Sequence, residues 1–303
     1  MTVTIIGTVA LDSIQTPQGA FNRILGGSAT YASTAASLFG PVHIVSVIGQ
    51  DFPDEHLAFL QSRGINTEGV EKKDGNTFHW EGFYTDDMSQ AHTLTTELNV
   101  LLEFDPIVPE SAKNSRIVFL ANIDPVLQRK AIRQFTNPEL IIMDSMNFWI
   151  ENHLHNLKDT LKEVDVLILN DQELRLLTKV DNLIAGMHEA MTFGPKRIIV
   201  KKGEHGAMML SENGFFVCPA FPLQQLTDPT GAGDSFAGGI AGYLAKATEI
   251  SEETFRQALI VGTLIASHTV QDFSLNKLKA LTTAEIQAQF ASYRDSALLP
   301  MTI

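Results

Sequence analysis

Short apolar runs rich in β-branched residues recur along the first two thirds of the chain. They are nearly continuous rather than alternating, which is typical of strands covered on both faces. The runs are Val3–Ile6, His43–Ile48, Ile117–Leu120, Leu140–Met143, Val166–Leu169 and Ile198–Val200. Segments with helical spacing lie between them, at Ser28–Phe39, Asp54–Gln61, Pro125–Phe135, Glu151–Lys162 and Asp171–Leu177. This alternation predicts an α/β fold of right-handed βαβ units, with a mainly parallel central sheet flanked by helices and ligands at the carboxyl ends of its strands.

The last third of the chain is expected to hold a hairpin and three helices. Asn213-Gly214 supplies a tight turn between two apolar segments, Ala207–Leu210 and Phe215–Cys218. The helices are expected at Ser235–Ala245, Glu252–Val270 and Thr283–Arg294.

Two segments, residues 11–19 and 76–96, interrupt the alternation. They mix polar, aromatic and threonine residues, which indicates strands outside the main sheet, and the second is too long for a plain loop. We interpret them as a small β-sheet lid inserted in a single domain of residues 1–303, and an edge hairpin without a gating role is the alternative. Aromatic residues of the second segment fit either stacking on a base or packing within the sheet: Phe78, Trp80, Phe83 and Tyr84.

Composition narrows the class of protein. A chain of 303 residues that is 44% hydrophobic can bury a large core, which indicates a globular protein. The formal charge of −13 argues against nucleic acid or an anionic membrane as a partner. A single cysteine, Cys218, excludes an internal disulfide and favours the cytoplasm. We see no basic leader and no apolar run approaching the roughly 18 residues of a membrane helix.

The stretch from Asp228 to Gly239 carries the most specific chemistry. Gly231 and Gly233 allow successive N–H groups to point into one concavity, and the helix expected next would add the positive end of its dipole. A phosphate group fits such a cradle. Asp234 stands where the helix begins, so its carboxylate could accept a proton from an attacking hydroxyl. An aspartate that only caps a packed helix is the alternative.

This stretch resembles the C-terminal signature of the ribokinase family of carbohydrate and nucleoside kinases, also called the PfkB family. The resemblance implies a ribokinase-like fold with a substrate-covering β lid. It implies that Asp234 is the catalytic base and that the amides of Gly231, Ala232 and Gly233 form the anion hole for the γ-phosphate. Asp228 and Thr230 resemble positions that hold a monovalent cation, K⁺ among them, in some members of the family.

A second glycine pair, Gly26-Gly27, precedes Ser28 at the start of an expected helix. A strand-to-helix turn accounts for it, but it also resembles the N-terminal family signature, whose glycines contact substrate hydroxyls. Ser28 and Tyr31 stand where ribokinases and several sugar kinases carry a basic residue and an asparagine, so ribose itself is not indicated. Asp12 follows the first strand and by itself suits a turn. The resemblance implies that Asp12 binds substrate hydroxyls.

The segment from Asn170 to Glu173 ends one strand and opens a helix. It resembles the Asn-x-x-Glu motif of the family, which implies that Glu173 acts through water on the Mg²⁺ of MgATP. The same residues could instead form a capping box.

Further candidates for nucleotide binding come later in the chain. The resemblance assigns Gly203 and Gly206 to the nucleotide, with Lys202 as a phosphate contact, whereas a hairpin turn with solvated lysines is the alternative. Ala266 resembles a position beside the adenine, and it also fits a small-residue packing face.

Four polar residues follow two of the expected strands: Asn122, Asp124, Asp144 and Asn147. They are candidate contacts for the substrate or for the Mg²⁺ shell, and turn or capping roles are the alternative.

These features together predict an ATP-dependent kinase that transfers the γ-phosphate of MgATP to a hydroxyl, expected to be primary, of a sugar or nucleoside. A non-catalytic sugar or nucleoside sensor with the same fold is the second hypothesis. An intact Asp234 and glycine turn favour the enzyme, because a pure binder needs no base. Exposed lid strands could pair across a two-fold axis, so a homodimer through the lid is a further hypothesis.

Overall fold

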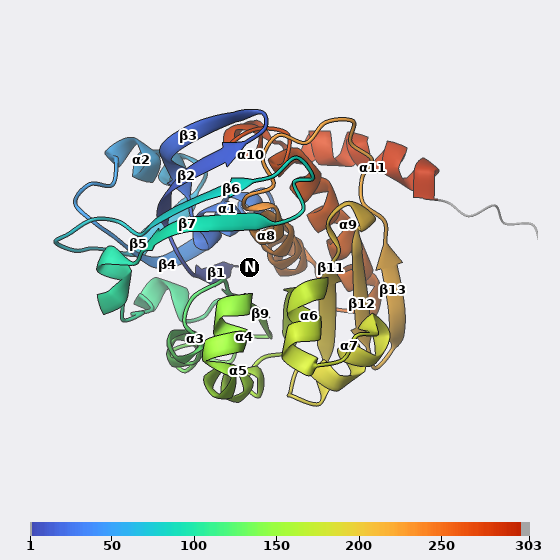
Figure 1. Ribbon diagram of the computed structural model, residues 1–303. Helices are drawn as coiled ribbons and strands as arrows, with labels where there is room; N and C mark the ends of the chain where they lie inside the picture. The colour runs from blue at the N-terminus through green and yellow to red at the C-terminus, as the bar shows by residue number, and fades with distance from the viewer. Residues whose placement is uncertain (1, 298–303) are drawn as a thin grey trace, which may run out of the picture.

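A nine-stranded sheet forms the centre of the molecule (Figure 1). The computed structural model describes residues 2–297, and side chains as far as residue 294. The strand order is β13-β12-β11-β10-β9-β8-β1-β4-β5, and every neighbouring pair from β11 to β5 is parallel. The strands are β1 (Val3–Ile6), β4 (Val42–Ile48), β5 (Ile65–Lys72), β8 (Ile117–Leu120), β9 (Leu140–Asp144), β10 (Val166–Asn170), β11 (Arg197–Lys201), β12 (Ala207–Ser211) and β13 (Gly214–Cys218). The predicted mainly parallel sheet is confirmed.

Helices cover both faces of this sheet. Alternate strand residues point to opposite sides, so Ile142 and Ile168 pack into one core while Met143 and Leu167 pack into the other. The first core includes α1 (Ser28–Ala36), α2 (Asp54–Ser62), α8 (Ala232–Lys246), α9 (Glu252–Thr269), α10 (Asn276–Ala280) and α11 (Thr283–Ala297). The second includes α3 (Pro125–Ile132), α4 (Asn147–Asn152), α5 (Leu154–Leu161), α6 (Asp171–Thr178), α7 (Leu183–Met191) and the 3₁₀ helix η1 (Asn99–Glu103). Two further 3₁₀ turns are η2 (Glu110–Ala112) and η3 (Gly203–His205).

A second, four-stranded sheet has the order β3-β2-β6-β7. Its strands are β2 (Ala10–Thr16), β3 (Gly19–Gly26), β6 (His79–Tyr84) and β7 (Ala91–Glu97). Only β2 and β6 pair in parallel. The two segments interpreted as a lid supply strands of this sheet, which we call the lid sheet. Sequence reasoning did not anticipate β3.

One predicted helix is wrong in its bounds. The segment Glu151–Lys162 is not continuous, because α4 ends at Asn152 and α5 begins at Leu154. His153 between them has φ −132° and ψ 30°, which is not helical, and its N–H donates to the carbonyl of Trp149. The break is not marked by proline or glycine, so the sequence pattern did not reveal it.

Within residues 2–297, no helix combines the length and the apolar character that crossing a membrane requires.

Candidate active site

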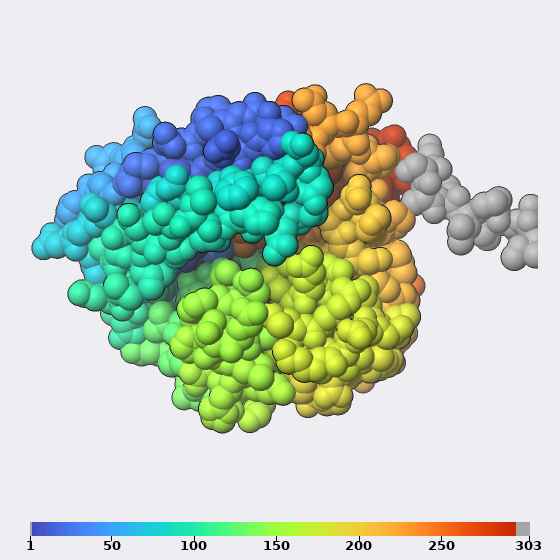
Figure 2. All heavy atoms as spheres, in the orientation of Figure 1, coloured from blue at the N-terminus to red at the C-terminus, as the bar shows by residue number. Residues whose placement is uncertain are grey.

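The main sheet changes its winding direction between β1 and β8. The chain proceeds from β1 through β4 to β5 on one side, and from β8 through β9 and β10 to β11 on the other. Such a switch point opens a crevice at the carboxyl ends of the strands, where α/β proteins bind ligands. Figure 2 shows a hollow in this region, between the teal strands of the lid sheet and the green to yellow helices α4 and α6.

The glycine turn, residues Asp228–Gly233, leads into α8. Asp228 is buried, and its Oδ1 accepts a hydrogen bond of 2.9 Å from the N–H of Thr230. Gly231 caps the helix with φ 75°, and a Cβ at this position would lie 2.4 Å from the ring of Tyr31. The turn is therefore closed to any residue but glycine.

The turn presents free N–H donors. Of the three amides predicted to form an anion hole, that of Ala232 donates to the carbonyl of Pro229 over 3.2 Å. In the part of the chain that the structure describes, the N–H groups of Gly231 and Gly233 have no protein acceptor. They lie at the positive end of the fifteen-residue helix α8. Two donors with no partner at a helix start fit a phosphate group.

Asp234 lies in the first turn of α8, directly after these amides. Burial by the surrounding protein, and after it the negative charge of Asp144, raise the pKa of its carboxyl to about 7, although Lys201 opposes the shift. A carboxylate with such a pKa can take up a proton near neutral pH, as a general base must.

Asp144 and Lys201 form an ion pair at the ends of β9 and β11. Lys201 Nζ lies 2.8 Å from Asp144 Oδ2. Burial alone would lower the pKa of Lys201, but Asp144 and Glu173 raise it to about 12. Sequence reasoning chose Lys202 as the phosphate contact. Lys202 follows β11, and its N–H donates to the carbonyl of Gly206. The lysine whose charge acts on Asp234 is Lys201.

Asn170 and Glu173 form the capping box of α6. Asn170 Oδ1 accepts from the N–H of Glu173, and Glu173 Oε2 accepts from the N–H of Asn170, both at 2.7 Å. The capping interpretation is therefore correct. Burial raises the pKa of Glu173 to about 7, with Lys201 lowering it and Asp144 raising it. Glu173 thus belongs to the same group of charges as Asp234.

The remaining residues predicted for nucleotide binding lie in η3, at its C-terminal end and on α9. Gly203 is exposed with φ 53°, and Gly206 has φ 84° with no room for a Cβ beside the carbonyl of Cys218. Their backbones close a tight turn, because the N–H of Gly206 donates to Gly203. Ala266 is half-buried on α9 and packs against the core around α8.

Asp12 belongs to the lid sheet. It lies inside β2, so the structure excludes the simple turn role. Its carboxylate accepts from the N–H groups of Gly27 and Trp80, while burial raises its pKa to about 7. A Cβ on Gly26 would stand 1.9 Å from Asp12 Oδ2, and Gly27 has φ 94°. The paired glycines therefore make room for this carboxylate.

Ser28 and Asn122 lie together at the switch point. Ser28 Oγ interacts with Thr8 Oγ1 over 3.1 Å and donates to the carbonyl of Asn122 over 3.3 Å, so the Ser28 hydroxyl is engaged within the protein. Asn122 Oδ1 accepts from Trp149 Nε1 at 2.8 Å. Of the other strand-end candidates, Asp124 caps α3, and Asn147 Oδ1 accepts from the N–H of Phe148.

The lid sheet touches the glycine turn. Thr230 Oγ1 donates to the hydroxyl of Tyr84 over 3.1 Å. Trp80 lies two positions before Gly82, where a Cβ would come within 2.3 Å of the indole, so the indole lies across the glycine. Its Nε1 donates to Thr93 Oγ1 over 3.1 Å. Because Trp80 is in register with Asp12 and an even number of residues from Tyr84, all three side chains lie on one face of the lid sheet.

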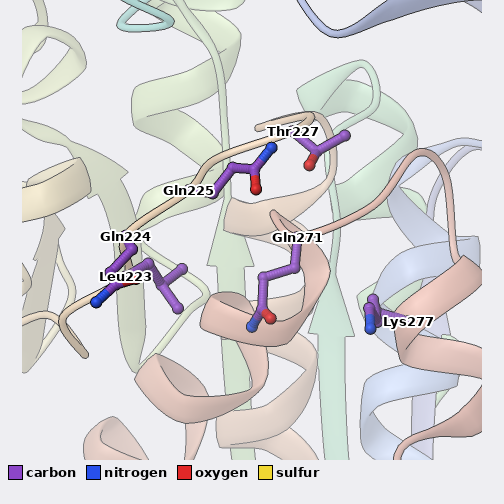
Figure 3. A pocket seen from close by; sticks show the side chains of 6 residues that line it. All are labelled: Leu223, Gln224, Gln225, Thr227, Gln271 and Lys277. Carbon is purple, nitrogen blue, oxygen red and sulfur yellow. The ribbon is translucent and has the colours of Figure 1, made fainter.

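A separate polar cavity of about 300 Å³ lies beside the segment that precedes the turn (Figure 3). In Figure 3, Gln225 and Thr227 reach toward it from that segment, with Gln271 and Lys277 on the opposite side. Asp12, Glu173 and Asp234 do not line it.

The donor set fits magnesium held mainly by nucleotide and water. Among the described residues, no three His, Cys, Asp or Glu side chains are grouped so as to hold a metal ion by themselves. Mg²⁺ keeps several waters and typically takes one or two carboxylates together with substrate phosphates. The Glu173 carboxylate, close to the phosphate cradle, suits that arrangement.

Comparison with known proteins adds to this geometry. A model of the pfkB family of carbohydrate kinases matches residues 2–280. A cytidine kinase of Thermococcus kodakarensis is 28% identical over 247 residues, which cover 79% of this chain and 87% of that protein. A nucleoside kinase of Thermoplasma acidophilum is also 28% identical, over 84% of this chain and 82% of its own length.

The fold is similar to that of solved kinases. A putative ribokinase II from E. coli, solved with ATP and Mg²⁺, superposes with a TM-score of 0.79 at 17% identity, over 96% of this chain and 99% of that one. The family match over nearly the whole chain, together with the glycine turn and the buried acid that follows it, shows that this protein belongs to the pfkB family of carbohydrate kinases.

Proposed function

We propose that this protein transfers the γ-phosphoryl group of MgATP to the primary hydroxyl of a nucleoside, with Asp234 as the base. The observation that carries the reaction is the position of Asp234, a carboxyl group with a pKa of about 7, directly after the free N–H donors of Gly231 and Gly233. Asp234 accepts the proton of the acceptor hydroxyl. The turn amides bind the oxygens of the phosphoryl group, with Ala232 completing the turn through its bond to Pro229.

The nucleotide side of the site comprises residues at the ends of β10 and β11 and on α9. We assign to it Asn170, Glu173, Lys202, Gly203, Gly206, Thr230 and Ala266. Glu173 would hold Mg²⁺ through water, and the ion neutralises charge on the phosphates when bound. Potassium is a further candidate ion, near Asp228 and Thr230. Activity measured in KCl and in NaCl at equal ionic strength tests that assignment.

A nucleoside acceptor is favoured over a free sugar by Trp80. Its indole lies across Gly82, is fixed through Nε1 and shares a face of the lid sheet with Asp12. A planar base can stack on the half-buried ring while Asp12, Gly26, Gly27, Ser28 and Asn122 surround the ribose. The cytidine and nucleoside kinases among the relatives support the same choice.

The lid sheet would close over the acceptor and exclude water, which limits wasteful hydrolysis of ATP. The segments assigned to it remain residues 11–19 and 76–96, to which β3 is added. All seven residues of β7 are exposed at an edge of this sheet, so a homodimer formed through the lid is part of the proposal. Light scattering that returns a monomer would remove it. We place the enzyme in the cytoplasm, where MgATP is supplied.

An acceptor screen tests the function. ADP release would be measured with MgATP against nucleosides and free sugars, for the wild type, Trp80→Ala and Phe83→Ala. Phe83 is the matched control, because the alternation along β6 places it on the opposite face, where it stacks on His92. We expect nucleoside turnover whose KM rises about tenfold or more in Trp80→Ala, since base stacking contributes about 1–3 kcal/mol. Ligand binding without turnover would favour the sensor.

A further inference from the structure

Lys201 and Asp144 are buried more deeply than surface ion pairs usually are. Their side chains are 19% and 5% exposed. Lysine normally keeps its ammonium group in water, and removing two charges from water costs free energy that their attraction often does not recover. Stability is therefore a weak explanation for this pair. A functional explanation requires a further group with which the positive charge of Lys201 interacts.

The ammonium group lies against the glycine turn. A Cβ on Gly233 would stand 3.1 Å from Lys201 Nζ, so the charge is in contact with the backbone that presents the free N–H donors. The alternation along the strands explains this placement. Ile142 and Ile199 face α8, so Asp144 and Lys201, two residues further along β9 and β11, emerge on the same side at the strand ends.

The surrounding charges need a cation. Lys201 contributes one positive charge beside the three carboxyl groups of Asp144, Glu173 and Asp234. An incoming polyphosphate adds further negative charge at the same place. Among the described groups that act on Asp234, Lys201 is the cation. Its ammonium group stands where it can offset charge on a phosphoryl group in the cradle.

We infer that Lys201 is a further catalytic residue, whose ammonium group, held by Asp144 against Gly233, binds an oxygen of the phosphoryl group during transfer. The inference rests on the proposed function. In that reaction the acceptor oxygen bonds to phosphorus, the bond from phosphorus to the β,γ-bridging oxygen breaks, and the acceptor proton goes to Asp234. Lys201 neither gains nor loses a proton and acts by charge and hydrogen bonding. Asp144 is a positioning residue, because it acts through Lys201.

A purely structural role is the competing account, in which Lys201 only neutralises Asp144. The single variant Lys201→Met does not separate the two, because it leaves a buried carboxylate unpaired and is expected to destabilise the fold. The double variant Asp144→Asn/Lys201→Met removes both charges together. The structural account predicts no loss of activity in this variant, because no charge is left unpaired. The catalytic account predicts a loss, because the contact of Lys201 with the phosphoryl group is absent.

The experiment compares the wild type, this double variant and Lys196→Met, a control at the exposed lysine that precedes β11. Calorimetry without an acceptor would measure binding of MgADP and of the magnesium complex of an ATP analogue with an imido β,γ-bridge. Thermal melting would verify the fold, and steady-state kinetics would measure kcat with the acceptor found for the wild type.

We expect the double variant to melt near the wild type and to bind MgADP within about twofold of it. The analogue, which carries the γ-phosphoryl group, should bind about tenfold more weakly, and kcat should fall about 10²-fold, the scale of losing one oxyanion-hole donor. Lys196→Met should keep wild-type values. A double variant with wild-type analogue affinity and kcat would overturn the inference.

Two further results have defined meanings. If the double variant does not fold, Asp144→Asn alone, which keeps the ammonium group, should lose up to about tenfold in both analogue affinity and kcat through misplacement of Lys201. Wild-type kcat in that variant would refute the assignment of Asp144. If the wild type turns over no acceptor, the proposed function is lost, while the two binding measurements still judge the contact of Lys201 with the γ-phosphoryl group.

Discussion

Replacing Gly231 with alanine tests whether the phosphate cradle depends on a backbone conformation and a packing space that only glycine fits. Gly231 has φ 75°, and the left-handed region costs other residues about 1–2 kcal/mol. The added Cβ would also lie 2.4 Å from the Tyr31 ring. Tyr31 is 1% exposed, so the ring has no solvent to move into, and overpacking of this kind costs about 1–3 kcal/mol. The free energy of unfolding should therefore fall by about 2–5 kcal/mol.

Gly203→Ala is the matched control. Gly203 also has a positive φ, 53°, but a Cβ there would meet nothing within 4 Å. It carries only the conformational cost of about 1–2 kcal/mol. Urea unfolding at pH 7 measures both variants, and Gly231→Ala should lose about 1–3 kcal/mol more than the control. Equal losses in the two variants would refute the packing of Tyr31 against the turn.

Three further outcomes follow from the charges and contacts of the site. Below pH 7, kcat/KM should fall about tenfold per pH unit, because burial raises the pKa of Asp234 to about 7 and the base must be ionised; a profile flat from pH 5 to 8 would contradict this. Asp12→Asn should stabilise the fold at pH 8 by up to about 4 kcal/mol, with the gain vanishing towards pH 4. The reason is that a carboxyl whose pKa rises from 3.8 to about 7 on folding opposes folding once it is ionised. Thermal melting of the wild type and the variant at both pH values measures the difference in stability, and equal stability of the two proteins at pH 8 would contradict the prediction. Tyr84→Phe removes the hydroxyl that accepts the hydrogen bond from Thr230. The KM for the substrate that receives the phosphoryl group should rise about fivefold, the effect of one hydrogen bond, whereas an unchanged KM would exclude a functional contact between the lid sheet and the glycine turn.

The glycine turn could be predicted from the sequence because its chemistry is contiguous. The glycine with positive φ, the free amides and the acid all lie between Asp228 and Asp234. The main sheet could be predicted for a similar reason. Strands covered on both faces must be apolar throughout, so each appears as an uninterrupted run.

Lys201 was missed, although the sequence held a signal for it. The expected strand ended at Val200, so both following lysines counted as loop residues. Strand β11 continues through Lys201, and the alternation that buries Ile199 toward α8 places Lys201 on the same side. The partner Asp144 comes from β9, more than fifty residues earlier, and no local pattern reveals that contact.

The lid sheet was predicted only in part, because one of its strands, β3, is exposed over half of its length. Strand β3 has exposed residues at Ala20–Arg23, so it lacks the apolar run of a buried strand. Asp12 is in register with Trp80 of β6, nearly seventy residues later in the chain. Contacts of this kind are decided by tertiary structure and lie beyond local propensity.

The most direct test of the central claim is ADP release from MgATP with the acceptor identified in the screen, measured for the wild type and for Asp234→Asn under identical conditions. The account predicts that turnover falls by about 10²- to 10⁴-fold in the variant, with acceptor and nucleotide still bound, because only the base is lost. Near-wild-type turnover by Asp234→Asn would contradict the assignment of Asp234 and, with it, the proposed mechanism.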